Sequence, residues 1–86
     1  MFTTYILYSK SIDKYYIGYT INLELRIERH NSGWGKYSSK GIPWKLVYSE
    51  SYNSKSDAIK RENQLKRMKS RKFIENLIIG NGGRPD

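Results

Sequence analysis

The absence of cysteine is the sequence feature that most restricts how this chain of 86 residues can fold. Disulfide frameworks and the usual zinc ribbons or fingers stabilise many small domains, and all of them need cysteine. The chain must therefore rely on one hydrophobic core, and at this size it has surface for one shallow site. With a single histidine, any metal would be held mainly by carboxylates and water, which suits Mg²⁺ or Mn²⁺.

The charge of the chain indicates an anionic partner. Lysine and arginine number 16 against 8 aspartates and glutamates, which gives a net charge of +8. A field of this sign attracts polyanions and keeps a protein in solution, so nucleic acid is the first partner to consider. No apolar run approaches the roughly 20 residues that span a bilayer, and the first residues lack the order of a signal peptide. We expect a soluble, cytoplasmic protein that does not bind membranes.

β-Branched and aromatic residues predict three strands. The segments TTYILYS at 3–9 and YYIGY at 15–19 are separated by a short polar stretch, which predicts a β-hairpin. The segment WKLVYSE at 44–50 alternates as a third strand. The glycine-rich stretch before it, 33–43, is expected to be an exposed loop with aromatic and basic side chains.

Capping residues and apolar periodicity predict three helices. They are expected to run from Asn22 to Gly33, from Ser54 to about Met68, and from Ser70 to Gly80. The order β-β-α-β-α-α predicts an α+β fold in which helices pack against an antiparallel-rich sheet. We expect residues 1–80 to form a single domain and residues 81–86 to be a flexible tail.

Helical periodicity directs three polar residues toward the interior. His30 falls within the apolar stripe of Leu23 and Ile27, and Arg26 lies on the border of that stripe. Glu62 projects from the middle of the apolar side of the next helix. That side consists of Ala58, Ile59, Leu65 and Met68. Burying an unneeded charge is costly, so such exceptions often mark sites.

Each of these residues also has a structural interpretation. Glu62 either pairs with Arg26 in a structural ion pair or binds a metal. His30 is a core or capping histidine or a catalytic one, and Arg26 either lays its stem on apolar surface or binds an anion. Gly18 is either a strand end with unusual backbone angles or a place where a phosphate approaches the sheet. The seven basic residues between 60 and 72 form a solvated helix face or an anion-binding one.

Over residues 3–79 the chain resembles the GIY-YIG nuclease family. It is most similar to the small single-domain bacterial members that are related to the nuclease module of excision repair. In the first half of the name-giving motif, Thr3-Thr4-Tyr5 stands where Gly-Ile-Tyr would be, so only the tyrosine is kept. The matching residues are Tyr5, the intact Tyr16-Ile17-Gly18, Arg26 and His30 in LRIERH, and Glu62 in IKRENQLK.

The resemblance implies a DNA endonuclease with a three-stranded antiparallel sheet and five residues around one cleft. Glu62 would bind Mg²⁺ or Mn²⁺, and Arg26 would grip the scissile phosphate. Tyr5 would receive the proton of the attacking water, provided that nearby cations lower its pKa. His30 or Tyr16 would assist this proton transfer.

Basic and aromatic residues around this cleft are expected to hold flanking phosphates and to stack on unpaired bases. The nucleic-acid-binding candidates are Gly18, Lys36, Lys40, Lys66 and Lys69, together with the aromatic Trp34 and Tyr37. So small a domain has little surface for reading bases, so structure-directed or weakly specific cutting is expected, in DNA repair or recombination. The alternatives are a non-catalytic nucleic-acid-binding module and a protein that docks on an acidic partner. The presence of both Arg26 and Glu62 favours the nuclease.

Overall fold

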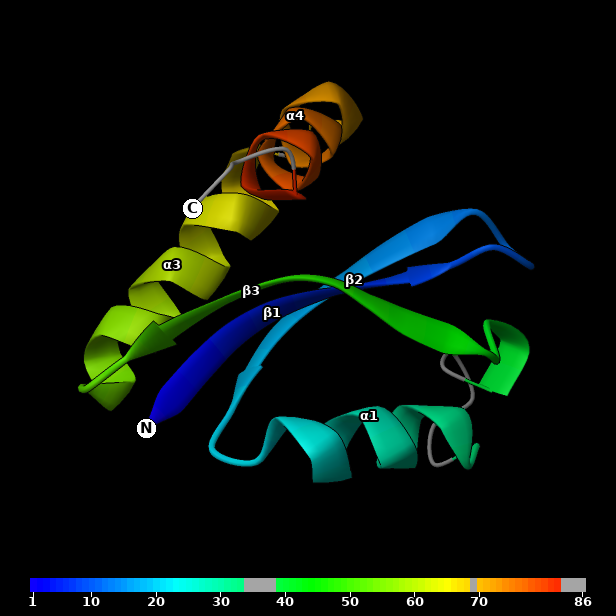
Figure 1. The fold of residues 1–86 in the computed structure, drawn as a ribbon, viewed down its shortest axis with the longest axis horizontal. Helices are drawn as coiled ribbons and strands as arrows, with labels where there is room; N and C mark the ends of the chain where they lie inside the picture. The colour runs from blue at the N-terminus through cyan, green and yellow to red at the C-terminus, as the bar shows by residue number, and fades with distance from the viewer. Residues whose placement is uncertain (34–38, 69, 83–86) are drawn as a thin grey trace.

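The computed structural model describes residues 1–33, 39–68 and 70–82. Three strands and three helices follow one another in the predicted order (Figure 1), so the α+β class is confirmed. No helix in these described ranges is long and apolar enough to cross a bilayer. The elements are β1 (Phe2–Ser9), β2 (Lys14–Thr20), α1 (Leu23–Asn31), β3 (Trp44–Tyr52), α3 (Lys55–Met68) and α4 (Arg71–Gly82).

Strand β1 is the centre of a three-stranded antiparallel sheet with the order β2-β1-β3. The turn from β1 to β2 contains Asp13, whose φ of 53° lies in the left-handed region that aspartate tolerates. Across the sheet, Tyr5 is paired with Gly18 of β2 on one side and with Ser49 of β3 on the other. This pairing fixes which side chains lie beside the Tyr5 phenol.

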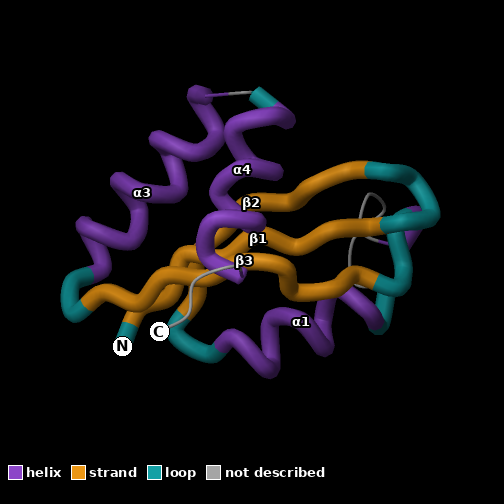
Figure 2. Tube along the Cα trace, turned by 45° about the horizontal axis from the view of Figure 1, so that its top comes forward, coloured by secondary structure: helices purple, strands orange, loops and turns teal. Residues whose placement is uncertain are grey.

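Helices cover both faces of the sheet, with α1 on one face and α3 and α4 on the other (Figures 1 and 2). Successive side chains of a strand point to opposite faces. Ile6 therefore packs with Leu65 of α3 and Ile74 of α4, while Tyr5 and Leu7 form a second cluster on the α1 side. The four consecutive residues 4–7 are all buried, because β1 has a helical layer on each face.

The helix starts are confirmed in detail. In each case the side chain of the predicted capping residue accepts a hydrogen bond from the backbone N–H three residues on. The pairs are Asn22 with Leu25, Ser54 with Asp57 and Ser70 with Phe73, at 3.1 to 3.2 Å. Helix α1 also ends as predicted, since Gly33 follows it with a left-handed φ of 81°.

The predicted end of α4 at Gly80 is wrong by two residues. The helix continues to Gly82, because a glycine inside a helix weakens it by only about 1 kcal/mol and does not by itself end it. Residues 81 and 82 of the expected tail are therefore helical, and residues 83–86 lie outside the described ranges. Apart from this boundary, the division into one domain and a tail stays a prediction.

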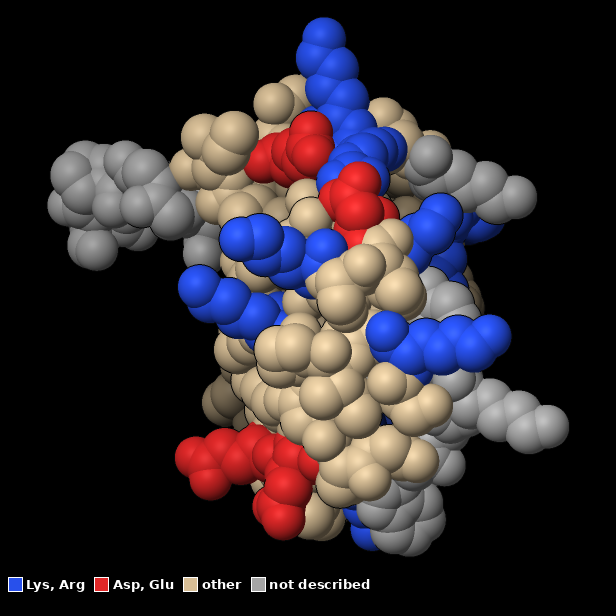
Figure 3. All heavy atoms as spheres, turned by 90° about the vertical axis from the view of Figure 1, so that its right-hand side faces the viewer, with Lys and Arg blue, Asp and Glu red and all other residues tan. Residues whose placement is uncertain are grey.

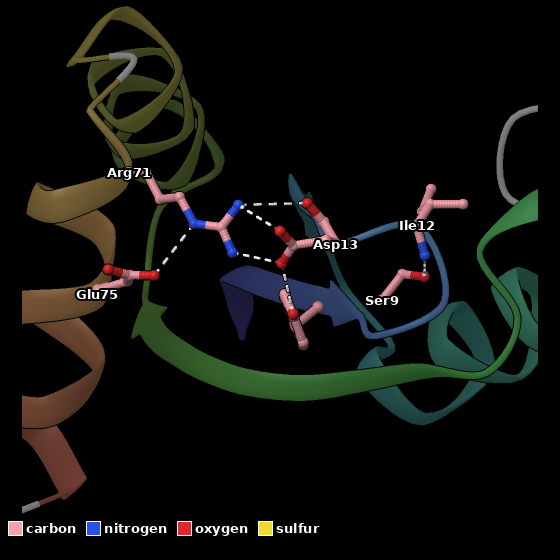
Figure 4. A network of polar contacts seen from close by, with 6 residues as sticks. Ser9, Ile12, Asp13, Arg71 and Glu75 are labelled. Carbon is pink, nitrogen blue, oxygen red and sulfur yellow. Dashed lines mark hydrogen bonds and ion pairs between the residues drawn. The ribbon is translucent and has the colours of Figure 1, made fainter.

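Two ionic clusters attach the last two helices to the sheet. Arg61 of α3 donates to both carboxylate oxygens of Glu50 in β3, at 3.0 Å each. Arg71 of α4 pairs with Asp13 in the β1–β2 turn and with Glu75 of its own helix (Figure 4). These clusters hold α3 and α4 in place against the sheet, and the placement of α3 positions the residues described next.

Candidate active site

A cleft of about 350 Å³ opens where β2 ends and the chain turns into α1. Residues from β1, β2, α1 and α3 line it. Four of the five predicted catalytic residues are among them, and so is Gly18: the four are Tyr5, Tyr16, Arg26 and Glu62. The structure thus brings together side chains that are up to 57 positions apart in sequence.

Tyr5 lies in the middle of these groups. Its side chain is fully buried, and its hydroxyl has no hydrogen-bond partner in the described part of the chain. Burial raises the pKa of Tyr5 to about 12, and the nearby Arg26 guanidinium opposes the rise only in part. The lowered pKa that the sequence-based role requires is not produced by the protein alone. Positive charge that enters the cleft would lower the pKa of Tyr5 toward its ordinary value.

Gly18 makes room for this phenol. A Cβ atom at position 18 would lie 2.7 Å from the Tyr5 hydroxyl oxygen and 3.3 Å from the Tyr16 ring. Neither sequence-based interpretation of Gly18 foresaw this, because the space beside the glycine is filled by a side chain of the site. The glycine is needed for close approach of Tyr5 across the β1–β2 pair.

Arg26 and Glu62 reach the cleft from opposite layers, since α1 and α3 cover different faces of the sheet. Their charges both act on the Tyr5 hydroxyl. The structural ion pair between them is not formed: within the described ranges, Glu62 pairs instead with Lys66, one helical turn on, at 2.9 Å. The Glu62 side chain is 15% exposed. A carboxylate and a guanidinium therefore face one phenol without neutralising each other.

The residues present fit a hydrated divalent ion. In the part of the chain that the structure describes, Glu62 is the one carboxylate on the lining of the cleft, and there is no cluster of three or more potential ligands from histidine, aspartate and glutamate. A single hard oxygen ligand suits Mg²⁺ or Mn²⁺, which keep several of their waters. The cleft has space for such waters, each of which takes up about 30 Å³ in the liquid. Glu62 is the residue that would hold the ion.

His30 lies behind the cleft rather than on its lining. It is 8% exposed, and neither ring nitrogen has a hydrogen-bond partner among the described residues. Its ring packs against Tyr16, with 4.5 Å between centroids, and lies 6.0 Å from Trp44. Burial, and secondarily Arg26, lower the pKa of His30, so its ring is neutral near pH 7. The His30 ring also lies edge-on to the Tyr5 ring, with 6.5 Å between centroids, so it is next to both phenol rings of the site.

The known GIY-YIG catalytic domain matches residues 1–76 of the chain. The chain belongs to the GIY-YIG family. Its relatives include a UPF0213 protein of Staphylococcus haemolyticus, which is 47% identical over 70% of this chain and 78% of that protein. A UPF0213 protein of Streptococcus pneumoniae is 46% identical over 64% of the chain, which spans only 57% of that relative. The solution NMR structure of a UPF0213 protein from Bacillus halodurans, 36% identical, superimposes with a TM-score of 0.61 over 96% of this chain and 88% of that one.

The GIY-YIG domain places the chain in a nuclease-type family that interacts with nucleic acid. Of the predicted nucleic-acid contacts, Lys66 is exposed on α3, and Lys40 is exposed in a short helical segment that does not line the cleft. Lys36 and Lys69 lie outside the described residues. The same is true of Trp34 and Tyr37.

The basic run between residues 60 and 72 is less uniform than the sequence suggested. Arg61 is neutralised by Glu50, and Arg71 by Asp13 and Glu75. These two arginines therefore have structural partners. Met68, predicted on the apolar side of α3, is 46% exposed, whereas Leu65, one turn earlier, is fully buried.

Lys55 is a cleft residue that the sequence interpretation missed. It is exposed at the start of α3 and lines the cleft with Glu62. The signal was present, because residues seven apart lie on nearly the same side of a helix. Phe2, Tyr19 and Ile21 also line the cleft, so an apolar wall accompanies its charged groups.

Proposed function

We propose that this GIY-YIG protein is a metal-dependent endonuclease that hydrolyses phosphodiester bonds in DNA. The observation that carries the proposal is the placement of Arg26 and Glu62 in one cleft around Tyr5, without an ion pair between them. A purely structural arrangement would neutralise these buried or half-buried charges against each other. Arg26 stays available for an anion, and among the described residues the Glu62 carboxylate is held only by the exposed Lys66, in a pair weak enough for a bound cation to displace.

The chain supplies groups for each requirement of phosphodiester hydrolysis. Arg26 offers a planar pair of N–H donors to two phosphate oxygens. Tyr5 and Tyr16 belong to the residues that line the cleft, and their phenols would hold or move the proton of the attacking water. Mg²⁺ or Mn²⁺ bound at Glu62 supplies Lewis-acid stabilisation of the charge that builds on the phosphoryl oxygens. His30 orients Tyr16 through ring contact.

The proposed substrate is DNA cut in a structure-directed or weakly sequence-specific way, in repair or recombination in the cytoplasm. The cleft offers few groups that could read base edges, and phosphate contacts by themselves carry no sequence information. We propose that residues 1–80, with the two further residues of α4, belong to a single domain.

A panel of labelled DNA and RNA structures incubated with Mg²⁺, with Mn²⁺ or with chelator tests this function. We expect nicking of at least one DNA structure with either metal, and none in chelator. Binding without cutting under both metals would establish the alternative, a non-catalytic nucleic-acid-binding module. Cutting that persists in chelator would refute the role of the metal.

A further inference from the structure

A basic groove lies on the outer side of α3. It has a volume of about 550 Å³ and is lined by Lys60, Asn63, Lys66 and Arg67, which we call the α3 basic groove. Among the described residues, its lining consists of three cationic side chains and one amide and includes no carboxylate. It is separate from the cleft, because the two share no lining residue.

Lys66 joins the groove to the cleft. At about 100° per residue, Lys66 lies about 40° around the helix from Glu62, and Asn63 and Arg67 follow in the same direction at about 100° and 140°. The Lys66 ammonium bonds the Glu62 carboxylate at 2.9 Å while its side chain is 53% exposed. One residue therefore belongs to the groove and contacts the proposed metal ligand.

The charges of the groove are available for an anion. Within the described ranges, Lys60 and Arg67 form no ion pair with a carboxylate, in contrast to Arg61 between them, which is bound by Glu50. The side of the molecule away from α3 is different, because Figure 3 shows acidic side chains interspersed with the basic ones there. Neighbouring cations that lack carboxylates match the repeated phosphates of a nucleic-acid backbone.

We propose that the α3 basic groove binds the nucleic-acid backbone beside the cleft, and that Lys66 couples this binding to Glu62. The inference rests on the proposed function for the role of Glu62. In the free protein, the Lys66 ammonium competes with a divalent cation for the Glu62 carboxylate. A phosphate in the groove offers Lys66 another anion, and the exchange is easy because exposed pairs of this spacing are weak. Substrate binding thus releases Glu62 for the metal.

The coupling is tested first without nucleic acid, by measuring Mn²⁺ affinity by electron paramagnetic resonance. Lys66→Met removes a charge within a few ångströms of the ligand, so it should tighten Mn²⁺ binding on the order of tenfold. Lys60→Met is the matched control, because it removes the same charge from the same groove without touching Glu62. Its Mn²⁺ affinity should stay within about twofold of wild type. Equal affinity in wild type and Lys66→Met, including absence of binding in both, overturns the coupling.

The groove is tested second, by DNA binding in chelator with a fluorescein-labelled duplex. Lys60→Met and Arg67→Met should each weaken binding and reduce the salt slope by about 1. Lys10→Met, at an exposed turn position outside the groove and the cleft, is the control and should leave both unchanged. If both groove variants keep the DNA affinity and the salt slope of wild type, the groove is not a binding site. Neither assay needs turnover, so their failure is distinguishable from a failure to cut DNA.

Discussion

Replacing Glu62 by glutamine separates a metal ligand from a structural carboxylate. The change keeps the volume of the side chain and removes the anionic oxygen on the lining of the cleft. Metal-assisted stabilisation supplies several kcal/mol of the barrier reduction, and about 3 kcal/mol corresponds to roughly a hundredfold in rate. We therefore expect Glu62→Gln to lower the cleavage rate at least about a hundredfold.

The same variant should melt almost like wild type. The ion pair lost with Glu62 is the one to Lys66, an exposed partner one helical turn away. Such pairs contribute about 0.3 to 0.5 kcal/mol. For a domain of this size, 1 kcal/mol shifts the melting temperature by about 4 to 8 °C, so the expected drop is at most about 4 °C.

Glu50→Gln is the matched control for stability. Glu50 accepts hydrogen bonds from Tyr48, Tyr52 and Arg61 at a half-buried position. Losing charged hydrogen bonds there costs about 1.5 to 3 kcal/mol, which is a drop of at least about 6 °C. Melting followed by circular dichroism and cleavage of labelled DNA with Mn²⁺ measure both effects. Cleavage by Glu62→Gln within tenfold of wild type, or a melting drop as large as that of Glu50→Gln, would refute the assignment of Glu62.

Three further outcomes follow from the geometry. Gly18→Ala places a methyl group 2.7 Å from the Tyr5 hydroxyl, so we expect the cleavage rate to fall about tenfold or more. An unchanged cleavage rate would show that the position of the Tyr5 hydroxyl is not critical. Burial alone raises the pKa of Glu50, but hydrogen bonds from its partners outweigh this and hold the pKa below its ordinary value. The stability that depends on this charge is present above about pH 4.5 and is lost as pH falls through the folded pKa. Between about pH 5 and 3, the melting temperature of wild type should therefore fall more than that of Glu50→Gln. Equal falls in the two proteins would contradict this. Tyr5→Phe should abolish most cleavage while keeping DNA affinity in chelator, and a fully active variant would exclude the Tyr5 hydroxyl from proton transfer.

Local features of the fold were predictable from the sequence, and distant contacts were not. Asn22, Ser54 and Ser70 act on backbone groups three residues away, so a capping residue beside an apolar pattern was enough to locate three helix starts. The pair of Arg71 with Asp13 joins residues 58 positions apart. Such a pair depends on how the last helix docks, which periodicity does not contain.

The site shows the same division. Periodicity correctly directed Glu62 and His30 inward, because each belongs to a helix with one apolar side. It did not indicate that His30 packs against Tyr16 and does not belong to the described lining of the cleft, since this contact joins a strand to a helix. Periodicity also did not identify the partner of Glu62, which is Lys66 at the favourable i,i+4 spacing and not Arg26.

The central place of β1 has a consequence for the order in which the protein acquires its structure. Strand β1 precedes both of its partners in the chain and lies in the middle of the sheet, so its hairpin with β2 can form early, while its other edge waits for β3 some 35 residues later. Closing such a loop costs entropy before the new pairing compensates for it. Glu62 is made later still, on a helix that packs on the assembled sheet. A nascent chain that has reached only β3 already carries Tyr5, Tyr16 and Arg26 but has no carboxylate from α3, so the proposed nuclease site is complete only once α3 has packed on the sheet.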